Sequence, residues 1–418
     1  MPVSRRIRIW LVAIAVLVLL GLLALRWFAQ PDRVASLLLS RAGDALGLEI
    51  AASGASEYRL LGTPMIAVRD VVAKQPGASA PLLRAKRIYL TLPWSTIRAR
   101  GADLTVERIE LDEPQLDVAA LQRWLASRPP SETKIPILTD GLRIGRGRAF
   151  GEGWALEDLD LSLPSLHPDR RVRASASGAF ALDGARLPFD LRIALTEPAA
   201  NAGLGIAGRI AVESSGWKLP MSPVLSGRLH SGADGIGLDR MKLGANARYL
   251  AKDTDLPFVF GLAGPLRYRE GGIAVAPLGA VVHGEGAVPN LNSHGRLSFG
   301  DGLSLRLSGK LAEWPQAWPA LPAPVGASES PLPFVLDYAG KADFSDIAAL
   351  DLQRDATKFA GRFRLPDIAT WIDAGSNGSP LPPLDGRLST PAMEVSGAHL
   401  EGVEIEIEDP AIAEPATR

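Results

Sequence analysis

The chain has 418 residues, 47% of them hydrophobic, and a formal net charge of -1 at pH 7. This is enough apolar material for a sizeable folded core. A charge so close to zero lacks the basic excess that binding to nucleic acid requires, so nucleic acid is not expected as a partner. The chain has no cysteine, which excludes disulfides, thiolate zinc sites, iron–sulfur clusters and cysteine nucleophiles.

An apolar run near the start of the chain predicts one membrane-spanning helix. The run from Ile9 to Leu25 falls within the roughly 17–25 residues that the hydrocarbon core of a bilayer requires. Arginines precede it, and aromatic residues lie at both ends, as in interfacial belts. The residues that define this anchor are Arg5, Arg6, Arg8, Trp10, Trp27 and Phe28. Because basic residues stay on the cytoplasmic side, we expect a cytoplasmic tail over residues 1–8, an anchor over 9–29, and the bulk of the chain outside the cytoplasm.

A cleaved signal peptide is the alternative interpretation of the same run. Cleavage needs small residues at positions −3 and −1 relative to the cut. Ala29 is the only small candidate for −1 near the end of the run, and Trp27 then occupies −3. This mismatch favours an uncleaved anchor.

After the anchor, the pattern predicts a short amphipathic helix followed by many strands. Apolar residues recur at helical spacing over residues 30–47, and Gly47 ends the helix. From Leu48 onward apolar and polar residues alternate in short runs, which is typical of half-buried strands, and the many Gly and Pro residues indicate turns between them. The clearest alternating runs are Leu187, Phe189, Leu191, Ile193 and Leu195; Leu159, Leu161 and Leu163; Leu303, Leu305 and Leu307; and Val403, Ile405 and Ile407.

Few segments depart from this strand pattern. Short helices are expected over residues 94–99, 118–126 and 367–373. Prolines punctuate residues 314–333, which also contain Trp314 and Trp318, so this stretch is predicted to be an irregular extended connection. The exported part therefore divides into a β-rich domain over residues 48–313, the proline-rich connection, and a C-terminal β module over 334–418.

Strands with one apolar face must bury that face. An antiparallel sheet does so against another sheet, by closing on itself, or by curling into a trough, and the pattern alone leaves the three open. A trough exposes more apolar surface than the few hundred Å² usual for a soluble monomer, which implies a bound partner or lipid.

Motifs at the two ends of the chain resemble the AsmA-like family of Gram-negative envelope proteins, the AsmA/TamB-type bridge-like proteins. The N-terminal motifs are LLRAKRIYLTL over residues 82–92, WSTIRAR over 94–100 and LTVERIELDEPQLDV over 104–118. The C-terminal motifs are FAGRFRLPDIATWI from Phe359 and SPLPPLDGRLSTPAMEVSGAHLEGVEIEIEDP from Ser379. Residues 141–309 resemble the family only in their general pattern of strands and turns.

The resemblance implies a mainly β fold in which an elongated, curled antiparallel sheet forms a groove with an apolar floor for acyl chains. It implies a protein anchored in the inner membrane, with its bulk in the periplasm, that acts in outer-membrane biogenesis and lipid homeostasis. Expected partners are the inner membrane, phospholipid and other envelope proteins. Candidate groove-lining residues are Leu187, Phe189, Leu191, Ile193, Leu195, Leu303, Leu305, Leu307, Val403, Ile405 and Ile407.

A non-catalytic structural component of an envelope machine, resembling the type II secretion N component, is the alternative function. Its sheets would close on themselves and bind other proteins. The lipid-shielding hypothesis expects bound lipid, whereas the structural-component hypothesis does not.

Enzyme signatures are not found in the sequence. P-loop, His-Glu-x-x-His and Gly-x-Ser-x-Gly motifs are absent. The five histidines are scattered singly, and Glu404, Glu406 and Glu408 alternate with apolar residues as on a solvated strand face. We therefore expect no enzymatic activity, no cofactor and no metal site, and an exported hydrolase is disfavoured.

Overall fold

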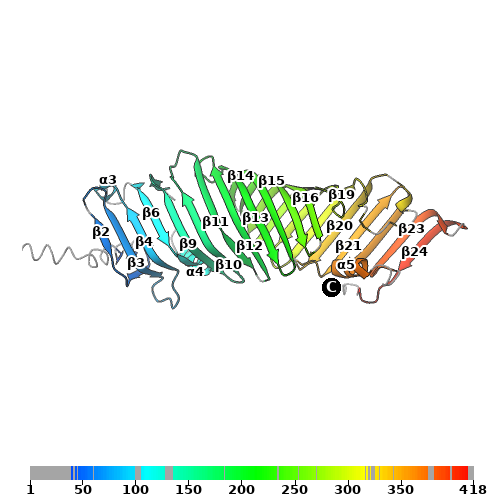
Figure 1. Ribbon diagram of the computed structural model, residues 1–418, viewed down its shortest axis with the longest axis horizontal. Coiled ribbons are helices and arrows are strands. Elements are labelled where there is room, and N and C mark those ends of the chain that lie inside the picture. Colours follow the sequence, from blue (N-terminus) through cyan, green and yellow to red (C-terminus); the bar gives the residue numbers. More distant parts are fainter. Residues whose placement is uncertain are drawn as a thin grey trace, which may run out of the picture. The chain divides into compact units, whose positions relative to one another are not determined.

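The structure is a computed structural model (Figure 1). It describes residues 39–412 apart from residues 41–42, 45, 60, 99–104, 128–134, 183, 233–234, 253, 270, 316, 319–320, 322–324, 329, 342, 375–380 and 396–397. The predicted cytoplasmic tail and anchor lie outside the described residues. Within the described part of the chain, none of the helices has the length and apolar character that crossing a membrane requires.

The fold is mainly β. A largely antiparallel sheet contains 22 strands, and β5 and β8 form a separate two-stranded sheet. The strands are β1 (Glu49–Ala52), β2 (Glu57–Arg59), β3 (Met65–Lys74), β4 (Leu83–Thr91), β5 (Thr105–Val106), β6 (Arg108–Asp112), β7 (Gln115–Asp117), β8 (Ile137–Leu138), β9 (Leu142–Gly151), β10 (Trp154–Leu163), β11 (Val172–Leu182), β12 (Ala185–Leu195), β13 (Gly203–Ser214), β14 (Trp217–Gly232), β15 (Gly235–Ala251), β16 (Thr254–Arg269), β17 (Gly272–Gly284), β18 (Leu291–Phe299), β19 (Leu303–Leu311), β20 (Leu332–Gly340), β21 (Ile347–Arg354), β22 (Thr357–Arg364), β23 (Leu384–Val395) and β24 (Ala398–Ile407). Beyond Gly47, the described residues form the helices α3 (Trp94–Arg98), α4 (Val118–Ala126) and α5 (Leu365–Ala374) and the 3-10 turn η1 (Val325–Ala327).

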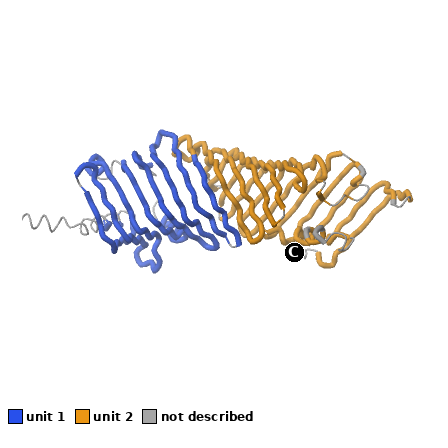
Figure 2. Tube along the Cα trace, viewed as in Figure 1, with its two compact units in different colours: residues 1–193 blue, residues 194–418 orange. Residues whose placement is uncertain are grey.

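The chain divides into two compact units, Met1–Ile193 and Ala194–Arg418 (Figure 2). In the first unit, β1 and β2 pair with β3, β3 pairs with β4, and β4 pairs with β6 and β7. Strands β6 and β7 run parallel to β9, and the connection between them contains α4 and β8, because parallel neighbours need a crossover. The Asp117 carboxylate caps α4 by accepting a hydrogen bond of 2.9 Å from the Ala120 amide.

The second unit is an antiparallel meander in which each strand from β13 to β24 pairs with the next. Between residues 194 and 311, every element that the structure describes is a strand. Helix α5 follows β22 and contacts that strand. This simple connectivity explains why short turns rich in glycine separate the alternating runs of the sequence.

The predicted short helices and alternating runs occur where the sequence placed them. Helices α3, α4 and α5 confirm the three short helices, and α4 has the predicted bounds. The four alternating runs lie in β12, β10, β19 and β24. The described residues between 39 and 46 are helical, and Gly47, at φ +61, follows them in the left-handed conformation typical of a helix C-terminus.

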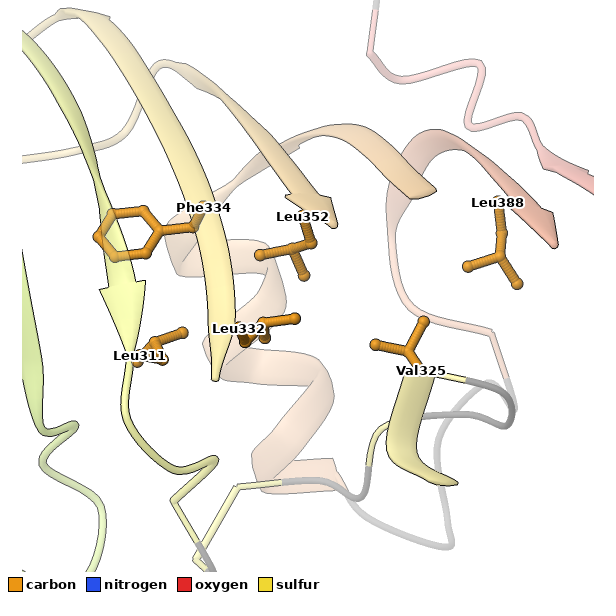
Figure 3. Close-up of a cluster of buried hydrophobic side chains, with 6 residues drawn as sticks. All are labelled: Leu311, Val325, Leu332, Phe334, Leu352 and Leu388. Carbon is orange, nitrogen blue, oxygen red and sulfur yellow. The ribbon is translucent and has the colours of Figure 1, made fainter. Parts of the chain in front are cut away.

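The proline-rich connection lies against the sheet. Val325 belongs to a buried cluster with strand residues of β19 to β23 (Figure 3). The members of this cluster are Leu311, Val325, Leu332, Phe334, Leu352 and Leu388. Arg354 Nη1 donates to the Val325 carbonyl at 2.9 Å, and Trp318 Nε1 donates to the Ala287 carbonyl at 2.9 Å. The described residues of this segment are therefore irregular, as predicted, but are packed as part of a core.

Candidate functional site

One face of the second unit carries an unbroken row of small and apolar residues. Residues directly opposite each other in paired strands share a face, so the register can be followed from strand to strand. From β13 to β24 the row consists of Ile206, Leu225, Leu243, Leu262, Ala280, Ser293, Gly309, Phe334, Leu352, Phe359, Leu388 and Ile405. Only Ser293 in this row has a polar side chain. We call this side of the second unit the apolar face.

The sequence-predicted residues of β19 and β24 lie on this apolar face. A second row runs from Leu307 through Leu336, Leu350, Gly361 and Gly386 to Ile407. Because alternate residues of a strand share a face, Leu303 and Leu305 join Leu307, while Val403 and Ile405 join Ile407. The two groups therefore share one face of the sheet, with the four strands β20 to β23 between them.

The first unit has an apolar row of its own. It consists of Val68, Ile88, Leu111, Ile144, Leu161 and Ala176. Leu159 and Leu163 share the face of Leu161. On β12, the apolar side chains from Leu187 to Leu195 are half-buried, and they alternate with exposed Arg186, Asp190 and Arg192. The alternation that the sequence predicted is therefore present on β12 too.

Four deeply buried residues of the apolar face lie on β15 and β17. Leu238, Met241, Val275 and Leu278 are 6%, 3%, 5% and 3% exposed. The residues packed around them come from the strands of the same meander. They are Leu204, Leu225, Leu229, Leu262, Leu266, Leu297 and Leu307. Neighbours on the same face therefore provide the burial.

These four residues flank a line of β-bulges. In β15 the register shifts between Leu238 and Met241, where Arg240 has φ +50, and in β17 it shifts between Val275 and Leu278. The β14–β15 and β16–β17 pairings shift at the same level. A bulge bends its strand and increases the local twist. Bulges on successive strands therefore bend the sheet along one line and bring the flanking side chains together.

The opposite face carries ion pairs in both units. In the first unit Arg87 joins Glu110 at 2.7 Å and Asp112 at 2.8 Å, across neighbouring strands. A hydrogen bond from Lys86 holds the pKa of Glu113 below its ordinary value. In the second unit Arg248 forms two hydrogen bonds of 2.6 Å with Asp255, and the pKa of Asp255 is lowered by that contact. The Arg248–Asp255 pair is exposed, and an exposed pair contributes little to stability.

Side-chain clusters that could hold a metal ion or perform catalysis are a second kind of candidate site. Across the described parts of residues 39–412, no group of three or more His, Asp or Glu side chains has the geometry to hold a metal ion. A hollow of about 540 Å³ lies on the charged face of the first unit, where Asp112, Asp160, Ser162 and Ser177 help to line it. The distinctive feature of the chain is therefore the apolar face.

Sequence reasoning missed the middle of this face. On β16, Leu256, Phe258, Phe260 and Leu262 alternate with Pro257, Val259 and Gly261, so the residues between them are not polar and the period-2 signal is weak. Trp217 and Tyr249, whose rings stack with centroids 5.9 Å apart, also share this face. The pairing register between neighbouring strands places these residues on one face, and the sequence pattern does not show that register.

The comparisons with protein-family models, curated proteins and solved structures found no match for this chain.

Proposed function

We propose that this chain is an AsmA-like protein anchored in the inner membrane, with its bulk in the periplasm, that shields phospholipid acyl chains on the apolar face in outer-membrane biogenesis and lipid homeostasis. The observation that carries the proposal is the row from Ile206 to Ile405, which is apolar or small at every position but Ser293. A surface of this kind binds by burial and needs no catalytic residue.

The proposal requires the apolar face to be a groove, and two observations support this. Leu238, Met241, Val275 and Leu278 are nearly inaccessible to solvent although the strands around them belong to one hydrogen-bonded sheet. A line of bulges crosses the strands that carry them. Side chains on a flat single layer stay open to water, so burial beside a bend favours a concave, curled sheet.

The dimensions of this groove suit an acyl chain. Strands lie about 4.8 Å apart, so the five spacings from β13 to β18 extend over roughly 24 Å. One leaflet of acyl chains spans about half of the roughly 30 Å hydrocarbon core. Each buried methylene contributes about 0.8 kcal/mol, so a single chain can be held by contact alone.

The proline-rich connection limits where lipid can lie. Trp314 and Leu321 pack against the buried cluster that contains Val325 and strand residues of β19 to β23. Leu332 in that cluster is 0% exposed, so this part of the apolar face is already covered. We therefore assign the acyl-chain site to β13 to β18.

A structural component of an envelope machine, similar to the type II secretion N component, is the competing function. The covered cluster around Leu332 is the observation that favours it, because closed packing is what such a protein would show throughout. Lipid content distinguishes the two.

Native mass spectrometry of the gently extracted full chain tests the proposal. The expected result is phospholipid bound in stoichiometric amounts. Leu262→Asp, on the apolar face, should lose that lipid, while the matched control Val259→Asp, on the opposite face of the same strand and 42% exposed, should retain it. Lipid-free wild-type protein, or equal retention in both variants, would overturn the proposal in favour of the structural component.

A further inference from the structure

A second apolar surface lies in the first unit, on the turn after β2 and on α3. Leu61 is 88% exposed, and Trp94 and Ile97 are each 41% exposed. Trp94 Nε1 donates a hydrogen bond of 2.9 Å to the Gly62 carbonyl, which joins α3 to this turn. Ile97 follows Trp94 by three residues and so lies beside it on the helix. We call Leu61, Trp94 and Ile97 the Trp94 patch.

The chain around the Trp94 patch is basic. Arg59 ends β2 and Arg98 ends α3, and both side chains are exposed. Residues 58–65 and 92–98 contain these two arginines and no aspartate or glutamate. Arg59 and Arg98 therefore lie in the two segments that carry the patch, while Glu57, the neighbouring acidic residue on β2, is paired with Arg69 at 3.3 Å.

This combination fits the surface of a bilayer better than it fits a protein. A stable protein interface buries about 800 Å² on each partner, more than three side chains supply. The interfacial region of a membrane accepts tryptophan rings together with leucine and isoleucine, while arginines meet the phosphates of anionic lipids. The indole N–H of Trp94 already has its hydrogen-bond acceptor, so its ring can enter the headgroup region without losing one.

We propose that the Trp94 patch docks onto a bilayer that contains anionic phospholipid. Leu61, Trp94 and Ile97 enter the boundary between headgroups and acyl chains, and Arg59 and Arg98 bind lipid phosphates. This site is separate from the apolar face of the second unit and does not require that face to hold lipid.

Because the natural chain contains no cysteine, one introduced cysteine can report on this contact in the full chain. Leu61→Cys, labelled with an environment-sensitive nitrobenzoxadiazole dye, is added to vesicles of phosphatidylcholine and phosphatidylglycerol that carry a nitroxide near the top of the acyl chains. Val224→Cys is the matched control, because Val224 is an apolar residue that is 61% exposed on the charged side of β14. Both sites are exposed, so neither substitution is expected to change the fold.

The emission of the dye at position 61 should shift to the blue when vesicles are added. The nitroxide should quench this emission at least three-fold more strongly at position 61 than at position 224. The double variant Arg59→Glu/Arg98→Glu, or vesicles of phosphatidylcholine alone, should reduce the quenching at position 61 at least two-fold. Equal quenching at the two positions overturns the docking proposal, as does a chain that fails to float with the vesicles. Quenching that is independent of both arginines and of lipid charge overturns the role given to anionic headgroups.

Discussion

Leu238 and Met241 are three residues apart in β15, yet both are buried on the same face of the sheet. The bulge at Arg240 inserts one extra residue between them and so shifts the alternation of faces by one position. Simple period-2 alternation would place them on opposite faces. The same relationship joins Val275 and Leu278 in β17. The bend produced by these bulges supports the proposed groove.

Shortening one of these buried side chains should cost stability. Met241→Ala removes a side chain that is 3% exposed, and we expect a loss of about 2–4 kcal/mol in the free energy of unfolding. Ile405→Ala, at a position 36% exposed on the same face, should cost less than about 1 kcal/mol. Chemical denaturation of both variants makes the comparison. Equal losses would show that burial in the second unit is uniform and that the bulge line has no special role.

Removing the Arg354 side chain should loosen the proline-rich connection. Arg354 is 7% exposed and supplies a hydrogen bond to the Val325 carbonyl. In Arg354→Ala that carbonyl loses a buried donor, which costs about 1–3 kcal/mol. Hydrogen exchange at the amides of η1 should accelerate, while exchange on β13 to β16 stays unchanged. Arg354→Lys, which keeps a donor, should exchange at an intermediate rate. Unchanged hydrogen exchange at the η1 amides in Arg354→Ala would contradict this role.

The charged face should respond to acid in a defined direction. The hydrogen bond from Lys86 lowers the pKa of Glu113 in the folded protein. A lowered pKa means that the contact contributes fully above the ordinary carboxyl pKa and that its contribution is lost as the pH falls through the folded-state value. In Lys86→Met the pKa of Glu113 should move up towards the ordinary value, as followed by NMR titration of its carboxyl carbon. Asp255, paired with Arg248, serves as the unaffected control. A Glu113 titration that does not move would refute the assignment.

The topology predicted from the sequence can be tested independently of the fold. A reporter enzyme that is active only outside the cytoplasm, fused after Arg418, should be active. N-terminal sequencing of the purified chain should recover residues 1–30. A silent reporter would contradict the predicted orientation, and an N-terminus near Gln30 would establish cleavage.

Local signals predicted the elements well, and non-local ones were missed. The helical pattern over residues 118–126 marks α4, and strict alternation from Leu187 to Leu195 marks β12, because both signals lie within a few neighbouring residues. The bulge at Arg240 and the parallel pairing of β6 with β9 depend on contacts between distant strands, and no short pattern encodes them.

The residues of the candidate site were likewise predicted only where a local pattern marks them. Alternation identified the apolar faces of β19 and β24, since polar residues separate the apolar ones there. It missed Leu262, because Val259 and Gly261 leave the opposite side of β16 without a polar signal. The packing of Val325 against Leu332 also escaped prediction, because prolines mark irregular backbone and do not say what the segment covers.

Photocrosslinking from β16 tests the central claim most directly. A benzophenone amino acid placed at Leu262 should form phospholipid adducts in the full chain, because that side chain lies on the apolar face of the proposed site. The same probe at Val259, on the opposite face of the strand, should form none, and both variants should melt like the native protein. Adducts at position 262 alone are the predicted result. No adduct at 262, or equal adducts at both positions, in proteins that melt normally would contradict the proposal that this face holds acyl chains.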